Sequence, residues 1–178
     1  MNKAEIVKEV LTERRSVRGF TSEKISEEAI EMIINAALTA PLAMGDAQTT
    51  HLTVVNDPEI AEEIRSAAML KSRTTGEPVD PFYGAQTFFF VSATDLSEDN
   101  IEFCNAGCVI ENMMIQATAL GLGSCYIWGC LRKLKKHPEV LEKLHLPAGY
   151  EILSALAVGY RDPEYVCKDR SVMDYNRL

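Results

Sequence analysis

The sequence predicts a sandwich of the α+β or α/β class, with helices that cover a small β-sheet. Apolar residues recur at helical spacing in several segments, and four short apolar runs have the composition of buried strands. After an initial pair of helices, strands and helices alternate. The expected helices are 4–13, 27–40, 59–70, 97–120 and short helices within 131–144, and the expected strands are 52–55, 87–92, 123–128 and 152–160.

Local signals support these elements in turn. Ser26 precedes two glutamates and is a suitable N-cap for the second helix. Pro58 suits the first turn of the third helix, and Gly121 is suited to end the long helix. Three consecutive phenylalanines in 87–92 indicate a buried strand, and the polar stretch 71–86, with its glycines and prolines, is expected to be a long surface loop.

Length and charge limit the function classes. The 178 residues suit one domain, 1–178, or one domain per subunit of an oligomer. The chain has 26 acidic and 18 basic residues and a formal net charge of −8, which argues against binding to nucleic acid or to anionic membranes. No apolar run is long enough to span a bilayer, and residues 1–5 lack the apolar region of a secretory signal, so we expect a cytoplasmic protein.

The long helix 97–120 is apolar around nearly its whole circumference, which predicts burial on all sides. One domain of this size seldom encloses such a helix by itself. We therefore expect a homodimer, with a central helix of a monomer as the alternative.

Basic side chains cluster near both ends of this acidic chain. Arg14, Arg15 and Arg18 follow the first helix, and Lys168 and Arg170 lie near the C-terminus. A compact basic cluster within an acidic protein indicates a local anion such as a phosphate group. We expect the two clusters to form the two halves of one anion site.

Five cysteines cannot all pair within one chain, and there is no CxxC motif. A metal site or a thiol-based redox function stays possible. Ordinary buried thiols of a reducing compartment fit the pattern better, and we expect no metal.

Several motifs together resemble the nitroreductase family of FMN-dependent homodimeric oxidoreductases. The stretch Arg14-Arg15-Ser16-Val17-Arg18 is similar to the N-terminal signature of that family. Similar family elements follow in the same order over nearly the whole chain, namely Ala37–Ala43, Ala119–Gly129, Ala157–Arg161 and Lys168-Asp169-Arg170. The resemblance favours the α+β class, with a central, mostly antiparallel sheet covered by helices in an intertwined homodimer that holds FMN at the subunit interface.

The resemblance also implies roles for individual residues. Arg14, Arg15 and Ser16, together with Lys168 and Arg170, would hold the FMN phosphate. Arg18 would lie near the pyrimidine edge of the flavin, where a cation stabilises the negative charge of the reduced ring. The backbone of Tyr126, Ile127, Trp128 and Gly129 would face the flavin ring, Gln48 would keep a family role, and the partner subunit would contribute Pro41, Leu42 and Ala43.

The segment 44–51 departs from the family pattern. Gly45 or Asp46 replaces an asparagine that contacts the flavin edge in the family, and Thr49-Thr50 replaces a Pro-Trp pair. The favoured function is an oxidoreductase that takes hydride from NADH or NADPH and reduces a small acceptor, such as a nitroaromatic or a quinone, by a ping-pong mechanism. The alternatives are a flavin-binding protein without nicotinamide turnover, for storage, sensing or cleavage of flavin, and the thiol- or metal-based domain.

Overall fold

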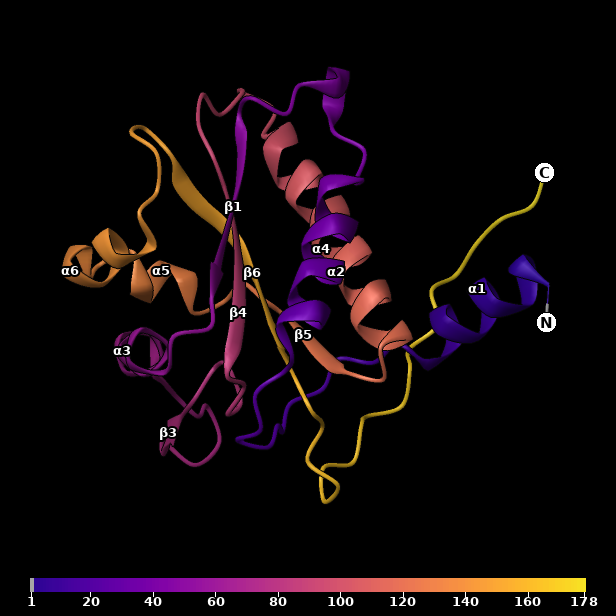
Figure 1. Ribbon diagram of the computed structural model, residues 1–178, viewed down its shortest axis with the longest axis horizontal. Coiled ribbons are helices and arrows are strands. Elements are labelled where there is room, and N and C mark those ends of the chain that lie inside the picture. Colours follow the sequence, from indigo (N-terminus) through magenta and orange to yellow (C-terminus); the bar gives the residue numbers. More distant parts are fainter. Residues whose placement is uncertain (1) are drawn as a thin grey trace.

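The computed structural model describes residues 2–178 and consists of helices packed on both faces of a four-stranded antiparallel sheet (Figure 1). The strand order is β1-β4-β6-β5, and every neighbouring pair is antiparallel. The predicted fold class is therefore confirmed, and of the two classes left open by the order of elements it is α+β. The strands are β1 Thr50–Val55, β4 Thr87–Ala93, β5 Gly123–Ile127 and β6 Glu151–Gly159.

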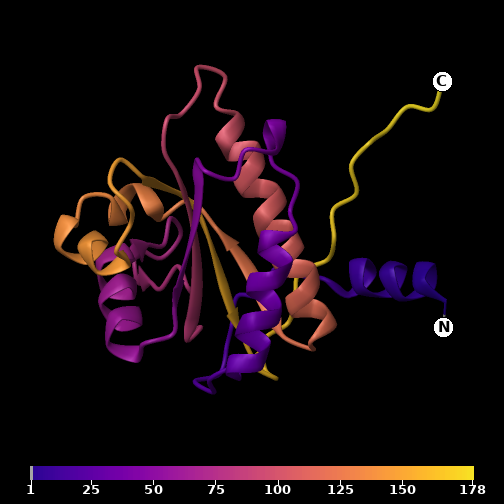
Figure 2. The same cartoon turned by 45° about the horizontal axis from the view of Figure 1, so that its top comes forward.

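Two layers of helices cover the sheet. One face carries the long helices α2 (Glu27–Leu38) and α4 (Ile101–Ala119), and the other carries α3 (Pro58–Ala68), α5 (Leu131–Leu134) and α6 (Pro138–Leu141) (Figures 1 and 2). The first helix, α1 (Lys3–Glu13), projects from the body of the domain (Figure 2). Within residues 2–178, no helix combines the length and apolarity needed to cross a membrane.

Helix caps explain where the first helices begin. The Asn2 side chain accepts a hydrogen bond from the Glu5 N–H, and Glu5 returns one to the Asn2 N–H, so the two residues form a capping box for α1. Ser26 caps α2 as predicted, and Asp57 caps α3 with Pro58 in its first turn.

Several boundaries differ from the prediction. The long helix begins at Ile101 rather than at residue 97, because the Ser97 N–H and hydroxyl bind the Glu102 carboxylate and hold the preceding residues in a turn. The segment 131–144 forms α5, α6 and the 3-10 turn η2 (Glu142–Leu144). The expected loop 71–86 contains a small hairpin of β2 (Leu70–Lys71) and β3 (Pro78–Val79), and a 3-10 turn, η1 (Ala43–Gly45), precedes β1.

Strand β4 is buried along its whole length and separates two apolar cores. Phe88 and Phe90 pack toward α3 and α5, whereas Phe89 packs toward α2 and α4. All three side chains are fully buried, so the strand predicted from the phenylalanine run is confirmed. Residues of one strand alternate between the two faces, which is why one run of three aromatics can fill both cores.

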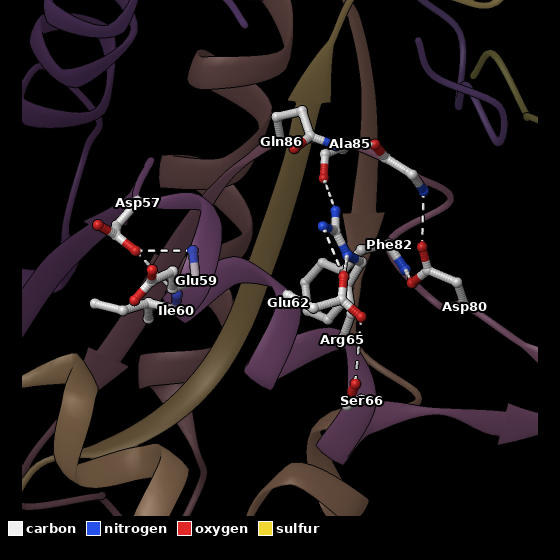
Figure 3. Close-up of polar contacts among 11 residues, drawn as sticks. Asp57, Glu59, Ile60, Glu62, Arg65, Ser66, Asp80, Phe82, Ala85 and Gln86 are labelled. Carbon is white, nitrogen blue, oxygen red and sulfur yellow. Dashed lines mark hydrogen bonds and ion pairs between the residues drawn. The ribbon is translucent and has the colours of Figure 1, made fainter. Parts of the chain in front are cut away.

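Polar contacts order the segment 80–86, and one of them joins it to α3 (Figure 3). The Arg65 guanidinium donates to the Ala85 carbonyl at 2.6 Å, and its charged group lies 5.9 Å from the Phe88 ring centre. The Asp80 carboxylate accepts hydrogen bonds from the backbone N–H groups of Phe82 and Gly84, both at 2.8 Å. These contacts hold Tyr83, between the two bonded residues, in a defined turn.

Helix α4 is not buried on all sides within one protomer, as expected for a helix that a single domain of this size does not enclose. Its inner face packs against the sheet and α2, whereas Ile101, Phe103, Cys104 and Cys108 are exposed. None of the residues of α1 is buried either, and its apolar side chains Ile6, Val7 and Leu11 are exposed. The protomer therefore leaves apolar surface of two helices uncovered.

Both faces of β4 should contribute comparably to stability. We expect Phe88→Ala and Phe89→Ala each to lower the free energy of unfolding by about 3–5 kcal/mol, because each opens a cavity in a closed core. Val166→Ala, at a position that is 84% exposed, is the control and should change it by less than about 0.5 kcal/mol. Urea unfolding followed by circular dichroism measures all three. A Phe89→Ala variant as stable as the control would show that Phe89 does not contribute to the core between the sheet and helices α2 and α4.

Candidate functional site

The N-terminal basic signature lies along the edge of the sheet. After α1 the chain pairs with β5, where the Val17 N–H donates to the Ser124 carbonyl at 2.8 Å and Ser16 forms a parallel bridge with Ser124. Val17 is buried in the core beneath. The apolar residue in the middle of the signature thus anchors it, while the charged residues on either side stay at the surface.

The C-terminal segment returns along the same signature. Phe20 bridges to Arg161, and the Asp162 N–H donates to the Gly19 carbonyl at 3.0 Å. A Cβ atom on Gly19 would lie 2.9 Å from the Cβ of Tyr165, so only glycine allows the tail to pack this closely. These contacts direct residues 168–170 back to the start of the signature.

The two basic clusters line one cavity of about 350 Å³. The structure therefore brings together the two segments that the sequence analysis assigned to one anion site. Five cations and one carboxylate surround the cavity, and the lining residues are Arg14, Arg15, Ser16, Arg18, Lys168, Asp169, Arg170 and Ser171. Such an excess of positive charge suits an anion that carries more than one negative charge.

Internal contacts orient the arginines of this cavity. The Arg170 Nη2 donates to the carbonyls of Leu11, Thr12 and Arg14 at 2.8–3.1 Å and thereby caps the C-terminal end of α1. The Arg15 guanidinium donates to the same Thr12 and Arg14 carbonyls. The Arg14 Nε lies 3.3 Å from the Glu111 carboxylate of α4. Sequence reasoning missed this capping role, because nothing in the tail indicates which carbonyls it will meet.

Arg18 lies between two tyrosines and a buried thiol. Partial burial acts to lower the pKa of Arg18, but the Cys125 thiol and the hydroxyls of Tyr165 and Tyr83 outweigh it, so the pKa lies above its usual value. Burial and the nearby Cys125 raise the pKa of Tyr83, against the opposing effect of Arg18. Arg18 therefore stays charged and Tyr83 stays neutral at physiological pH. Sequence analysis did not single out Tyr83, which has a φ of 57° in the turn fixed by Asp80.

Tyr126, Ile127, Trp128 and Gly129 form the far end of β5 and the turn after it. The basic cavity begins beside Ser124, and a strand of this length extends roughly 16 Å. The Tyr126 hydroxyl is 2.7 Å from the Ser154 hydroxyl, and Trp128 is 58% exposed. A Cβ on Gly129 would meet nothing within 4 Å, so the protomer leaves open space there.

Four predicted site residues lie away from the cavity in the same protomer. Pro41, Leu42 and Ala43 follow α2 and lie near the N-terminal end of α4, where the Ala43 N–H donates to the Asn105 side chain at 2.8 Å. Gln48 follows them, and its carbonyl accepts a hydrogen bond from the Tyr150 hydroxyl. The basic signature lies at the other end of α4 (Figure 1). A single chain does not bring the two sets together.

The cysteines lie in different environments. Cys104 and Cys108 are exposed, Cys167 is partly buried, and Cys125 and Cys130 are buried. Burial raises the pKa of Cys125 and raises that of Cys130 to about 12, so both are neutral thiols at physiological pH. In the part of the chain that the structure describes, no group of three or more histidine, cysteine, aspartate or glutamate residues is arranged to hold a metal ion.

The structure is that of an α+β protein in which helices cover an antiparallel sheet and both ends of the chain line one basic cavity. The sequence profile of the nitroreductase family matches residues 11–160, and the chain therefore belongs to the nitroreductase family. The resemblance stated from the motifs is confirmed.

Known proteins of the same kind are similar over nearly the whole chain. A protein of Archaeoglobus fulgidus with the provisional name NADH dehydrogenase/NAD(P)H nitroreductase is 29% identical over 88% of both chains. The FMN reductase [NAD(P)H] of Bacillus subtilis is 29% identical over 88% of this chain and 66% of its own length. The crystal structure of a nitroreductase with bound FMN from Bacteroides fragilis superposes with a TM-score of 0.79 at 28% identity, covering 100% of this chain and 98% of that one.

The buried thiols give a direct test of the cysteine environments. Only the thiolate reacts readily with alkylating reagents. A pH of 8 lies well below the Cys130 pKa of about 12, so this thiol stays protonated. We expect iodoacetamide to leave Cys125 and Cys130 unmodified in the native protein and to modify both after unfolding in urea. Mass spectrometry of peptides locates the modified residues. Rapid native labelling of Cys130 would contradict its burial.

Proposed function

We propose that this chain is a single FMN-binding domain, 1–178, of a homodimeric oxidoreductase that uses NADH or NADPH. The observation that carries the proposal is the cavity lined by Arg14, Ser16 and Arg170, where both ends of the chain meet. The similar proteins support it, because they include an FMN reductase that uses NAD(P)H and a nitroreductase with bound FMN. The absence of a membrane-crossing helix within residues 2–178 is compatible with the expected cytoplasmic location.

The residues of the cavity fit the phosphate of FMN. A phosphate monoester carries about −1.5 to −2 charge near neutral pH, so it needs more than one cation. Arginine forks match phosphate oxygens with paired N–H groups, and the Ser16 hydroxyl adds a donor. Arg170 uses Nη2 to cap α1, and its other N–H groups remain for the phosphate. A bound phosphate would thus connect the end of α1 to the C-terminal tail.

The rest of the proposed cofactor site follows β5 toward Trp128 and Gly129. FMN supplies the ring that accepts hydride. The backbone of residues 126–129 orients that ring, and the open space at Gly129 allows a close approach. Arg18 lines the cavity and interacts electrostatically with Cys125 of β5, and its retained positive charge would stabilise electron density on the pyrimidine edge.

The proposed site is complete only with a second copy. Pro41, Leu42, Ala43 and Gln48 lie at the opposite end of α4 from the cavity, so they can contribute only across a subunit interface. The exposed apolar residues of α1 and the outer side of α4 provide surface for that interface. An intertwined homodimer satisfies both observations.

Nicotinamide and acceptor would occupy the same place over the ring in turn, which gives a ping-pong mechanism. Nitroaromatics and quinones remain the expected classes of acceptor. The alternative, a flavin-binding protein without nicotinamide turnover, rests on the altered segment 44–51. The FMN reductases among the relatives favour turnover.

The purified protein should be yellow, and NADH or NADPH should bleach the flavin absorbance in the absence of air. Arg14→Ala should lose most of its FMN on dialysis, because removal of a charge-assisted contact weakens binding roughly tenfold or more. We expect Arg170→Ala to lose FMN as well, but less of it. Arg177→Ala, outside the cavity, is the control for loss of one positive charge. Flavin absorbance per protein measures occupancy. A yellow protein that neither nucleotide bleaches would support the alternative, and full retention of FMN in both variants would overturn the phosphate site.

Light scattering should show a dimer. Leu11→Glu places a charge on the apolar stripe of α1, where the side chain is 42% exposed in the protomer, and we expect it to shift the protein toward monomer. Thr12→Glu adds the same charge to the same helix outside that stripe and should stay dimeric. Circular dichroism of both variants checks that the fold is retained. A monomeric wild type would remove the interface.

A further inference from the structure

A second basic cluster lies beyond the far end of β5. Gly129, Arg132, Lys133 and Lys136 line a hollow of about 240 Å³. All three cationic side chains are exposed, within a chain whose net charge is −8. The hollow lies past the C-terminal end of β5, whereas the cavity of Arg14 and Arg170 lies beside its start. The two sites are therefore distinct.

The lysines beside the cluster differ from it in their ion pairs. The Lys135 ammonium pairs with Glu151 at 2.5 Å, and Lys143 pairs with Glu63. Among the described residues 2–178, no carboxylate lies within ion-pair distance of Arg132, Lys133 or Lys136. Among the lysines and arginines of residues 129–143, those that line the hollow have no acidic partner, whereas Lys135 and Lys143 each have one.

One hydrogen bond and one exposed aromatic side chain characterise the surroundings of the hollow. The Lys133 Nζ donates to the carbonyl of Met69, the residue between α3 and β2, which fixes this ammonium at one side of the hollow. Trp128, the single tryptophan of the chain, is 58% exposed next to Gly129. An exposed indole offers a flat surface on which an aromatic base can stack. Unpaired cations beside an aromatic surface match the chemistry of a phosphorylated nucleotide.

We propose that Arg132, Lys133 and Lys136 bind the phosphate monoester of an incoming nucleotide substrate and select nucleotides that carry one. This proposal rests on the proposed function, because a substrate that reacts over the ring near Gly129 extends naturally toward this hollow. Two sources offer such a phosphate: the 2′-phosphate of NADPH, which NADH lacks, and the 5′-phosphate of FMN as an acceptor, which riboflavin lacks. The cluster lies too far along the sheet to hold the phosphate of the resident cofactor.

The kinetic experiment compares two double variants with the same change of charge. Arg132→Gln/Lys136→Gln removes two unpaired cations and keeps Lys133, which binds Met69. Lys135→Gln/Lys143→Gln is the matched control and removes two lysines that already have acidic partners. Steady-state KM and kcat are measured for NADPH and NADH, and then for FMN and riboflavin as acceptors. Flavin content is measured in every variant and should not change.

If NADPH is the source, the first variant should raise KM for NADPH about tenfold and change KM for NADH less than about twofold. If FMN is the source, the same contrast should appear between FMN and riboflavin. Higher salt should weaken the preference in the wild type, because the cluster is exposed and its charges are screened. Loss of neither preference, or an equal effect of the control variant, would overturn the proposal.

A binding experiment separates failure of this proposal from failure of the proposed function. Adenosine 2′,5′-bisphosphate and adenosine 5′-phosphate are titrated into the purified full chain, with the fluorescence of Trp128 as the signal. The first ligand should bind about tenfold more tightly than the second, and the first double variant should lose the difference. To test FMN as the source of the phosphate, FMN and riboflavin replace the two adenosine nucleotides in the same titration. Selective binding without nicotinamide turnover would refute the proposed function alone, whereas turnover without phosphate-selective binding in either pair would refute the cluster alone.

Discussion

The pairing of the N-terminal signature with the edge of β5 is the contact on which the site depends. The hydrogen bond from Val17 to Ser124 and the burial of Val17 place the neighbouring charged residues at the surface beside the sheet. The C-terminal segment then follows the signature, since Asp162 binds Gly19 and the Tyr165 ring covers it. Without this pairing, residues more than 150 positions apart in the sequence would not meet.

The clustering of five cations costs electrostatic free energy, and the protein offsets only part of it. Glu111 pairs with Arg14, Asp169 lines the cavity, and backbone carbonyls at the end of α1 accept hydrogen bonds from Arg15 and Arg170. Carbonyl oxygens at a helix C-terminus carry partial negative charge, so they are suited to this role. Because an excess of positive charge remains, the cavity favours a multiply charged anion over chloride or water.

The sequence predicted the elements whose periodicity or composition is strong. The Ser26 cap, the phenylalanine run of β4 and the basic signature all carry local signals that the structure bears out. The β2–β3 hairpin was missed, because two-residue strands are too short to show a period. The sequence indicated that α4 needs cover on all sides, but apolar periodicity does not show which chain supplies that cover, and one protomer leaves part of the helix exposed. Tyr83 was missed because its position depends on the local turn that Asp80 holds and on the contact of Arg65 in α3 with the Ala85 carbonyl.

The residues proposed for the cofactor site fall into two groups that lie at opposite ends of α4. The residues proposed to hold the FMN phosphate are positioned by β5 and by both chain ends within one protomer, so the basic cavity forms in a single chain. Residues 41–48 lie at the other end of α4. The segment 44–51 contains the departures from the family pattern, and it begins at the fully exposed Met44, which has a φ of 56°. In the proposed homodimer, a partner subunit would contribute this segment to the cofactor site. Because this segment lies away from the basic cavity in the protomer, its departures from the family pattern leave the residues proposed to hold the phosphate unchanged.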